Sequence, residues 1–474
     1  MESPNRYWQP SLQYAVLSDR GLRRSNNQDS VAAVPAANRS HWRRRGHLFL
    51  VADGMGAHAA GEMASGMTAE LVPLTYGKLQ DLSPPDALAT AIRETNHQIH
   101  TRGNANRDFQ GMGTTVSTLL LLPEGAVIGH VGDSRIYRLR GDRLEQLTAD
   151  HSLAWDVRMA GDQLNAFVAE KFPNGVPKNI ITRSLGPAHD VLVDIEGPIP
   201  IQPGDTFLMC SDGLSGPVHD PELATILSLF PPDEAARILV DTANLRGGPD
   251  NITLIIIRVN DPMMRELGAD GGSIVRFSAG PDDDPELDDG SDADDAVGAV
   301  NNPPRPVVTR GQLHTFAAIT AGAGLAAGLA AGVLIPSPWG IVGGIAATAV
   351  VSLIGVVIGM IWRDRLAAAA NVPPWHATLR GHGPYMQQPV DYDVEFMQRL
   401  ARITLQLREA SENSGWEVDR EPFRGHYESA VAASNIGDHR TAIRELCLAM
   451  RFLMEQLRSG RPETAMRKQE KKGS

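Results

Sequence analysis

The sequence predicts an α+β protein whose N-terminal half forms one mixed domain with antiparallel sheets. Between residues 13 and 259, short apolar runs rich in Val, Ile and Leu alternate with helical patterns and Gly/Asp turns. Residues 311–362 contain no Asp, Glu, Lys or Arg, and helical apolar stripes follow near the C-terminus. These observations predict four segments: a mixed α+β domain over 10–260, a linker over 261–310, two apolar helices over 311–363 and a small all-α domain over 385–460.

Within the mixed domain, each expected strand is a short apolar run bounded by turn residues. The expected strands cover residues 47–52, 115–121, 126–131, 135–147 (folded over a Gly141-Asp142 turn), 206–210 and 252–259. Helices are expected to begin at Gly61, at Pro84 and at Pro231, the last two because proline followed by an acid favours a helix start.

Composition excludes several classes of protein. A length of 474 residues suggests about two to four domains. The formal charge of −12 argues against a nucleic-acid binder, because such proteins neutralise phosphates with excess Lys and Arg. Cys210 and Cys447 are too few for a disulfide framework or a thiolate zinc site. The first thirty residues are polar and lack a secretory signal, so the N-terminal domain is expected in the cytoplasm.

The segment 261–310 is expected to be a disordered acidic linker. Nine acids lie between residues 282 and 295, and no Lys or Arg occurs between residues 277 and 304. Such a run repels itself and stays solvated, which favours a flexible spacer. An electrostatic mimic or a partner-binding tail is the alternative.

The segment 311–363 is expected to form two transmembrane helices. Pro336 and Pro338 divide it into two apolar stretches of about 21 to 23 residues, each long enough to cross a bilayer. Glycines recur at intervals of four, a spacing that lets helices approach closely in lipid. Arginines flank the segment on both sides, which predicts a cell-membrane protein with two spans and with its N-terminal domain and C-terminus in the cytoplasm. A buried Ala/Gly-rich helix pair in a soluble domain is the alternative.

Three helices are expected near the C-terminus, over residues 391–413, 427–439 and 441–458. The first and third place apolar side chains on one face. The turn before Ala442-Ile443 is similar to that of a tetratricopeptide helix pair, although only one copy is visible.

Four aspartates share one context, because each lies at the end of an expected strand. They are Asp53, Asp133, Asp212 and Asp250. A carboxylate at a strand end is held by rigid backbone yet faces a loop, and Gly54 has no side chain to keep its carbonyl from a cation. Oxygen ligands without clustered Cys or His indicate Mg²⁺ or Mn²⁺. A single Asp-Gly pair is more often a plain turn, but four such aspartates together favour a metal site.

Eight sequence blocks, taken in order, resemble one known family. They are Ser18-Asp19-Arg20-Gly21 through Asn27-Gln28-Asp29-Ser30, Asp53-Gly54-Met55-Gly56, Gly113-Thr114-Thr115, Gly132-Asp133-Ser134-Arg135, Asp150-His151-Ser152-Leu153, Thr182-Arg183-Ser184-Leu185, Ser211-Asp212-Gly213-Leu214 and Asp250-Asn251. The stretch from residue 14 to residue 259 thereby resembles the metal-dependent serine/threonine protein phosphatases of the type 2C class, in their bacterial form. The resemblance implies a four-layer α-β-β-α sandwich, in which two antiparallel sheets pack face to face between helices.

The resemblance also implies a mechanism and a role for each matched residue. Two Mn²⁺ or Mg²⁺ ions activate a water that attacks phosphoserine or phosphothreonine directly. Asp53 is implied as the bridging ligand, with Gly54, Asp212 and Asp250 completing the pair of sites and Asp133 as the candidate for a weaker third metal. Arg24 matches the phosphate-binding arginine, although a solvated charge beside Arg23 is the alternative.

Some positions depart from the family's pattern. Gln28 and Asp29 are expected behind the metal ligands, but the position of Gln28 is often Glu in the family, so a neutral amide replaces an anion there. Some members carry a His directly after the metal-binding Asp-Gly, and this chain has Met55. The general acid is therefore unassigned, and nearby His58 is more often structural in such a Gly/Ala-rich turn.

The sequence as a whole predicts a membrane-tethered phosphatase that acts on phosphorylated proteins, with membrane serine/threonine kinases as candidate substrates and with no nucleic-acid partner. The rival is a catalytically inactive phosphatase-fold scaffold that binds phosphoproteins at the membrane. A zinc hydrolase or a kinase lacks any supporting motif, since neither His-Glu-x-x-His nor Gly-x-x-x-x-Gly-Lys occurs.

Overall fold

The structure is a computed structural model that describes residues 12–56, 59–160, 176–177, 180–260, 275–276, 383–413 and 420–459. The chain divides into two compact units. One unit comprises Met1–Pro281 together with Ala377–Ser474, and the other comprises Asp282–His376. The second unit lies outside the described residues, so everything below concerns the first.

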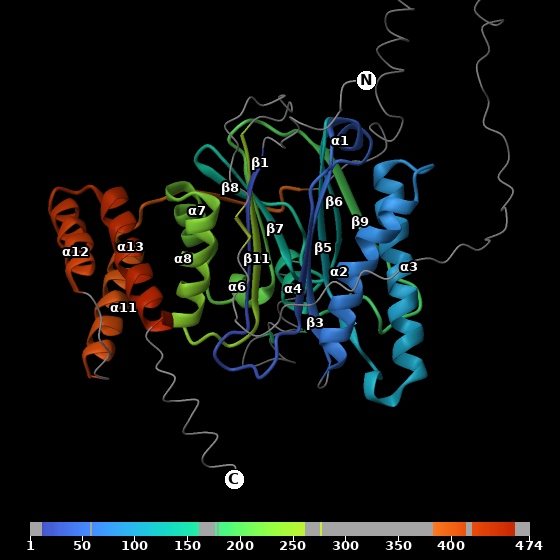
Figure 1. Cartoon of the computed structure of the whole chain (residues 1–474), viewed down its shortest axis with the longest axis horizontal. Helices are drawn as coiled ribbons and strands as arrows, with labels where there is room; N and C mark the ends of the chain where they lie inside the picture. Colours follow the sequence, from blue (N-terminus) through green and yellow to red (C-terminus); the bar gives the residue numbers. More distant parts are fainter. Residues whose placement is uncertain are drawn as a thin grey trace, which may run out of the picture. The chain divides into compact units, whose positions relative to one another are not determined.

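Two β-sheets form the centre of this unit (Figure 1). In the described residues, one sheet has seven strands in the order β12-β1-β11-β10-β7-β8-β13, and the other has the order β2-β3-β5-β6-β9, with β4 paired to β3. The strands of the first sheet are β1 (Leu12–Asp19), β7 (Arg135–Arg140), β8 (Arg143–Gln146), β10 (Thr206–Cys210), β11 (Ile252–Val259), β12 (Val275–Arg276) and β13 (Met386–Pro389). Those of the second are β2 (Asp29–Val34), β3 (His47–Met55), β4 (Gly113–Thr114), β5 (Val116–Leu122), β6 (Gly125–Val131) and β9 (Asp194–Ile199).

The pairing in both sheets is antiparallel with one exception, since β12 runs parallel to β1. The two sheets pack through a core in which Phe49 and Leu119 from one sheet meet Phe207 and Ile255 from the other, all fully buried. Each such side chain contributes about 1.5–3 kcal/mol by leaving water. This core holds the two sheets together and fixes the strand ends that carry the aspartates.

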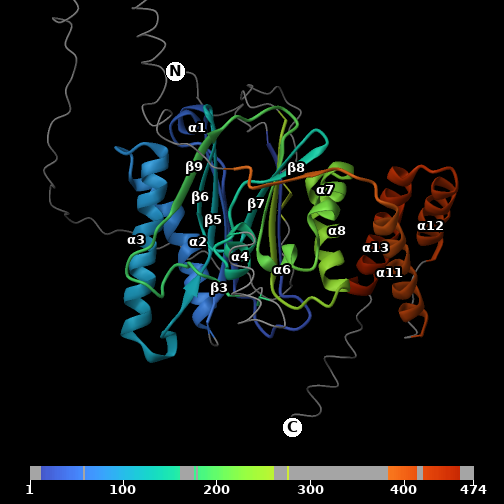
Figure 2. The same ribbon diagram turned by 180° about the vertical axis from the view of Figure 1, so that it is seen from behind.

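Helices cover the outer face of each sheet (Figures 1 and 2). The helix α2 (Ala60–Lys78) packs on β2 and β3, and α3 (Pro84–Ala105) packs on α2. On the other sheet lie α7 (Asp220–Leu229) and α8 (Pro232–Leu245). Shorter helices are α1 (Arg39–Arg45), the 3-10 helix η1 (Arg107–Phe109), α4 (Leu153–Ala160) and α6 (Asp212–Ser215). The layers therefore follow the predicted α-β-β-α order.

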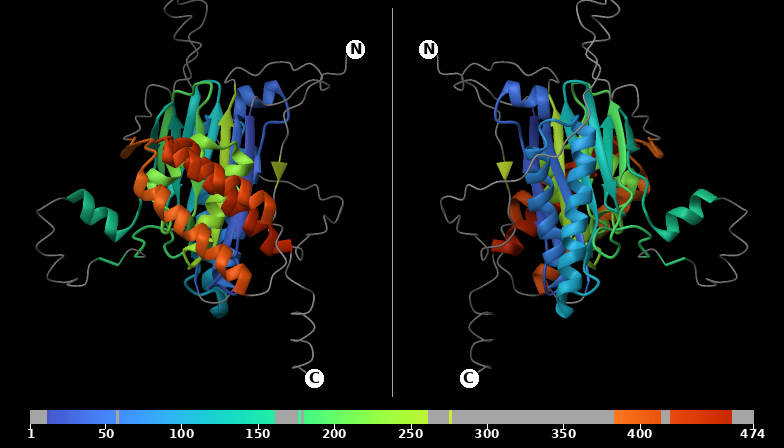
Figure 3. Two further views of the ribbon diagram at one scale, coloured as in Figure 1. Left: turned by 90° about the vertical axis from the view of Figure 1, so that its left-hand side faces the viewer. Right: turned by 90° about the vertical axis from the view of Figure 1, so that its right-hand side faces the viewer.

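Three C-terminal helices form a further layer outside α8 (Figures 1 and 3). They are α11 (Val394–Asn413), α12 (Arg420–Asn435) and α13 (His439–Ser459). Phe396, Ile443 and Met450 from this layer share one apolar core with Leu223 and Ile238 of α7 and α8. Residues 383–413 and 420–459 are thus packed into the same compact unit as the sandwich. The predicted domain boundaries stay a prediction.

Most expected elements are confirmed. β3, β5, β6, β10 and β11 form where apolar runs predict strands, and the run over residues 135–147 folds as β7 and β8 about Gly141. α2, α3 and α8 begin within one residue of their predicted starts, with the Ser83 side chain capping α3. The sequence analysis did not predict β1, β2, β9 or β13.

The predicted localisation as a two-span membrane protein is contradicted. Among the helices that the structure describes, none is both long enough and apolar enough to cross a bilayer. α13, for example, has 21 residues but includes Arg444, Glu445 and Arg451. The predicted spans at 311–363 lie outside the described residues, as does the predicted linker at 261–310 apart from β12. The membrane assignment is therefore withdrawn.

An ion pair between a half-exposed arginine and a buried aspartate joins the C-terminal layer to α8. Arg458 of α13 donates a hydrogen bond to Oδ1 of Asp241, which is fully buried. Burial raises the pKa of Asp241 to about 7, and the charge of Asp19 adds to this rise, while Arg458 and Arg237 oppose it. Because the unfolded value is about 3.9, the folded protein binds an extra proton between about pH 4 and pH 7.

The stability contributed by Asp241 should therefore fall as pH rises through this window. We expect the stability of Asp241→Asn minus that of the wild type to be larger at pH 8 than at pH 5, because the amide carries no charge to desolvate. Thermal unfolding of both proteins from pH 5 to pH 8 measures the difference in Tm. A difference that stays constant over this range would contradict the buried, proton-binding carboxyl.

Candidate active site

The β2–β3 register brings two acidic residues together at one end of the second sheet. Asp29 of β2 lies directly opposite Asp53 of β3. The Asp53 backbone is fixed on both sides, since its N–H donates to Thr115 Oγ1 at 2.9 Å and its carbonyl accepts from the Thr115 N–H at 2.9 Å. The Asp53 carboxylate is thus carried on a rigid strand end.

The first sheet supplies two more aspartates from neighbouring strands. Asp212 begins α6 directly after β10, and Asp250 precedes β11, which pairs with β10. A hydrogen bond links the two sheets here, because Ser211 Oγ donates to Asp29 Oδ2 at 2.8 Å. Asp212 and Asp250 therefore face the pair formed by Asp29 and Asp53 across the sandwich.

Asp133 lies between β6 and β7 and is 7% exposed. Among the residues that the structure describes, its buried Oδ1 has no hydrogen-bond partner. An unsatisfied buried carboxylate oxygen is costly unless a cation or a donor compensates it. This oxygen is an independent sign that a ligand belongs here.

Burial, reinforced by mutual repulsion, raises the pKa values of four of these carboxylates, namely Asp29, Asp53, Asp133 and Asp212. Burial raises the pKa of Asp29 to about 7 and that of Asp133 to about 7, and the charge of Asp212 adds to both shifts. Burial raises the pKa of Asp53 well above its ordinary value, and the charges of Asp29, Asp212, Asp133 and Asp250 add to the rise. Burial and the charge of Asp250 also raise the pKa of Asp212. The cluster thus has an excess of negative charge that a divalent cation would neutralise.

Arg24 is also at this site. Its Nη2 donates to Asp250 Oδ2 at 2.6 Å, with the Arg24 side chain 48% exposed. The loop that carries Arg24 is held by Asn251, whose amide donates to the carbonyls of Arg20 and Asn26 at 2.9 Å. Asn251 Oδ1 also accepts from the Gln28 N–H at 2.9 Å. The sequence analysis quoted Asn251 in a motif but gave it no role, since these are long-range contacts.

Gln28 supports the end of β3 through its backbone carbonyl. Its carbonyl accepts from the Gly54 N–H at 3.0 Å and from Ser65 Oγ at 2.6 Å. It therefore ties the strand end of β3 to α2. All the predicted site residues, namely Arg24, Gln28, Asp29, Asp53, Gly54, Asp133, Asp212 and Asp250, belong to this network of contacts and charges.

A second network that the sequence analysis missed holds the backbone beside Asp133. The Gly132 N–H donates to His151 Nδ1 at 2.9 Å, and His151 Nε2 bonds Asp194 Oδ2 at 2.9 Å. Burial alone would raise the pKa of Asp194, but hydrogen bonds from His151 and Arg183 lower it to about 2. Asp194 is therefore a charged anchor for His151. His151 stood in a quoted motif, but nothing in the sequence pointed to Asp194.

The donor set fits a hard divalent cation. It consists of carboxylate and carbonyl oxygens, with one orphaned carboxylate oxygen at Asp133. In the described part of the chain, however, no three His, Cys, Asp or Glu side chains already stand in a ready-made ligand shell. Asp53 and Asp212 are close enough to share a side-chain hydrogen bond, whereas Asp250 is engaged with Arg24. A bound cation would have to draw Asp250 away from Arg24.

Gly54 occupies a place where no side chain fits. A Cβ added there would lie 2.2 Å from the Gly61 carbonyl oxygen and 2.4 Å from that of Gln28. We expect Gly54→Ala to lower the free energy of unfolding by about 3 kcal/mol, because backbone on two sides must move. Gly66→Ala in α2 is the matched control: its Cβ meets nothing within 4 Å, so it should stabilise by about 1 kcal/mol. Urea unfolding measures both, and equal effects would contradict the tight packing at Gly54.

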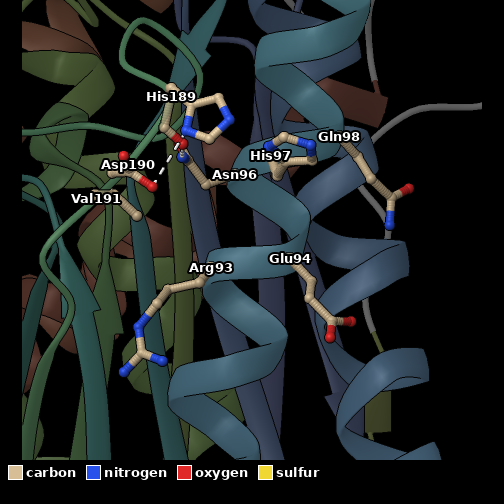
Figure 4. Close-up of a pocket in the computed structure, with 8 residues that line it drawn as sticks. All are labelled: Arg93, Glu94, Asn96, His97, Gln98, His189, Asp190 and Val191. Atoms are coloured by element: carbon tan, nitrogen blue, oxygen red, sulfur yellow. Dashed lines mark hydrogen bonds and ion pairs between the residues drawn. The ribbon is translucent and has the colours of Figure 1, made fainter. Parts of the chain in front are cut away.

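A pocket elsewhere lies between α3 and the segment after Gly186 (Figure 4). Figure 4 shows His97 of α3 facing His189, which pairs with Asp190 at 3.2 Å. None of the predicted site residues lines it. It is therefore separate from the aspartate cluster. The candidate His58 lies outside the described residues.

Comparison with known proteins shows that residues 22–244 match the family model described as Protein phosphatase 2C. A putative protein phosphatase 2C-type from Streptococcus pyogenes is 37% identical over 252 residues, which covers 52% of this chain and 97% of that protein. The serine/threonine protein phosphatase PstP of Mycobacterium tuberculosis is 37% identical over 257 residues, 53% of this chain and 45% of PstP.

Solved structures of similar proteins were also found. The crystal structure of the Mycobacterium tuberculosis phosphatase PstP/Ppp is 34% identical and covers 53% of this chain and 99% of that one, with a TM-score of 0.44. The catalytic domain of PstP in complex with two manganese ions is 33% identical, with coverages of 53% and 99% and a TM-score of 0.42.

Proposed function

Because this chain belongs to the protein phosphatase 2C family, we propose that its aspartate cluster hydrolyses phosphoserine and phosphothreonine in proteins with the help of two divalent metal ions. The chain is a metal-dependent serine/threonine protein phosphatase, in line with relatives such as PstP, which is named a serine/threonine protein phosphatase. The observation that carries the proposed mechanism is the gathering of Asp53, Asp212, Asp250 and Asp133 from two sheets, with an orphaned oxygen on Asp133.

In this proposal, Asp53, the Gly54 carbonyl, Asp212 and Asp250 would hold the two ions, with Asp53 as their shared ligand, and Asp133 would hold a weaker third ion. Mn²⁺ or Mg²⁺ suits these oxygen donors. When bound, the ions supply an activated water for direct attack on phosphorus and neutralise charge on the phosphoryl oxygens. Asp29 and Gln28 support the ligands from behind, since Asp29 lies opposite Asp53 and the Gln28 carbonyl holds Gly54.

Arg24 binds the phosphate of the substrate in this proposal. Its guanidinium offers a fork of N–H donors that matches two phosphate oxygens. Its partial exposure leaves it accessible to a phosphorylated protein. Binding requires Arg24 to exchange its hydrogen bond with Asp250 for the phosphate, which would at the same time leave Asp250 available to a cation.

The expectation that the substrates are membrane kinases depended on the membrane anchor, and it is withdrawn together with that anchor. Phosphorylated proteins are the substrate class proposed.

The test uses the purified full chain and measures phosphate release from phosphothreonine, phosphoserine and phosphotyrosine peptides. We expect release from the first two with Mn²⁺ or Mg²⁺ and none after addition of a chelator, with activity returning when metal is restored. Activity that persists in chelator would contradict the metal mechanism. A folded chain that binds Mn²⁺ and phosphopeptide without releasing phosphate would instead support the inactive scaffold.

A further inference from the structure

The C-terminal part of the chain contributes a strand to the catalytic sandwich. β13 pairs antiparallel with β8, with Met386 opposite Gln146 and Pro389 opposite Arg143. The Tyr385 N–H donates to the Gln146 carbonyl at 2.9 Å, which continues this pairing by one residue. A segment more than two hundred residues downstream of β8 is therefore built into the same sheet.

One side chain of this segment, Tyr385, contacts two other elements. Its ring packs edge-on against Trp155 of α4, with the ring centroids 6.2 Å apart and the planes at 77°. Its hydroxyl donates to Oε1 of Glu196 on β9. Trp155 is 7% exposed and Glu196 is 6% exposed, so both partners of Tyr385 are buried. Tyr385 thus joins α4 to β9.

Both of these elements are attached to the backbone beside Asp133. On β9, Asp194 precedes Glu196 by two residues, so the two side chains share one face of the strand. The His151 ring bonds Asp194 through Nε2 and accepts the Gly132 N–H through Nδ1. The His151 backbone N–H also donates to the Gly132 carbonyl at 2.7 Å. Since Nδ1 accepts, the ring proton is on Nε2 and is donated to Asp194.

The second attachment runs through α4. The helix begins two residues after His151, and the Trp155 N–H donates to Ser152 Oγ at 3.3 Å. Gly132 itself has little freedom, because it adopts a φ of +118° and a Cβ there would lie 2.5 Å from Thr115. Tyr385 therefore stands at the outer end of a chain of contacts whose inner end is the peptide that carries Asp133.

We propose that Tyr385 is a positioning residue for the phosphatase: acting through Glu196 and Trp155, it holds the Asp194–His151–Gly132 contacts and so fixes Asp133. The part of the test that measures activity rests on the proposed function. The part that measures hydrogen exchange does not, because the contacts of Gly132 and His151 exist in the metal-free protein.

The test compares Tyr385→Phe with the wild type in the full chain. The matched control is Tyr392→Phe, since Tyr392 belongs to the same segment but places its hydroxyl 3.4 Å from Ser228 on α7. Hydrogen exchange of the metal-free proteins is measured on peptides covering residues 131–134 and 150–155. We expect Tyr385→Phe to speed exchange there by about tenfold while exchange in α2 and α8 stays unchanged, because local opening becomes easier. Tyr392→Phe should leave these peptides as in the wild type.

The second readout is the Mn²⁺ concentration that gives half-maximal phosphopeptide hydrolysis. We expect Tyr385→Phe to raise this concentration about 3- to 10-fold, which is less than the effect of removing a direct partner of a metal ligand. The kcat at saturating Mn²⁺ should stay within about twofold of the wild-type value. A double variant with Glu196→Gln tests the route. If Tyr385 acts through Glu196, the two substitutions should be non-additive.

Unchanged exchange at residues 131–134 and 150–155 would overturn the inference, whatever the activity. A uniform rise in exchange over the whole unit, with a matching fall in Tm, would also overturn it, since that is the effect of a merely structural residue. If Tyr385→Phe does not fold, Glu196→Gln alone decides by the same peptides. A wild type that releases no phosphate would refute the proposed function while the exchange result still decides the inference.

Discussion

Replacing Asp53 with asparagine is expected to lower kcat/KM for a phosphothreonine peptide by on the order of a thousandfold. Asp53 is the proposed bridging ligand, and metal-assisted stabilisation of the transition state is worth several kcal/mol, of which about 4 kcal/mol corresponds to this factor. Steady-state kinetics at saturating Mn²⁺ measure the loss. The metal-free variant should be at least as stable as the wild type, because one of the mutually repelling carboxylates is removed.

Asp81→Asn is a suitable control, since Asp81 is an exposed aspartate in the loop between α2 and α3. It should keep wild-type kinetics. If Asp53→Asn retains more than about a tenth of the activity at the same Mn²⁺ concentration, Asp53 is not the bridging ligand.

Arg24→Ala is expected to lower kcat/KM by about a hundredfold while leaving Tm nearly unchanged. A hydrogen bond to a charged group contributes about 1.5–3 kcal/mol, and about 2.7 kcal/mol corresponds to this factor. The effect on stability should be small, because the Arg24 and Asp250 side chains are 48% and 32% exposed and such pairs contribute little. Kinetics with phosphothreonine peptide and thermal unfolding measure the two effects.

Arg23→Ala is the matched control, since Arg23 is the neighbouring exposed arginine of the same loop. The proposed role requires a large difference between the two variants. Equal, small losses in both would mean that Arg24 contributes only general positive charge to the site, which is the solvated-charge alternative.

The strands that carry the aspartates could be predicted because they are buried on both faces. The run that forms β3 is continuously apolar because both of its faces are buried. Phe49 and Val51 enter the core between the sheets, and α2 packs on β3 from the other side. β13 could not be predicted in this way. Its sequence Met-Gln-Gln-Pro has no apolar alternation, and it is held by backbone pairing with β8. β12 is similarly short and pairs with β1 through two residues.

The candidate site was only partly visible in the sequence. The aspartates at strand ends indicated a metal site, whereas their individual roles came from the resemblance to the phosphatase family. The sequence did not indicate that Asp29 lies opposite Asp53 or that Arg24 pairs with Asp250, because both depend on the register or the docking of segments far apart in the chain. The Tyr385–Glu196 contact joins residues 189 positions apart and has no sequence signature.

The pairing of β13 with β8 also bears on solubility. In the described residues, β8 would be the last strand on its side of the sheet if β13 were absent, and its unpaired backbone groups would then be open to pairing with another chain. The helices α11 and α13 likewise cover apolar side chains of α7 and α8, including Leu223 and Ile238. A chain shortened to residues 1–281 would expose both the strand edge and this apolar face, so we expect it to self-associate at concentrations at which the full chain stays monodisperse.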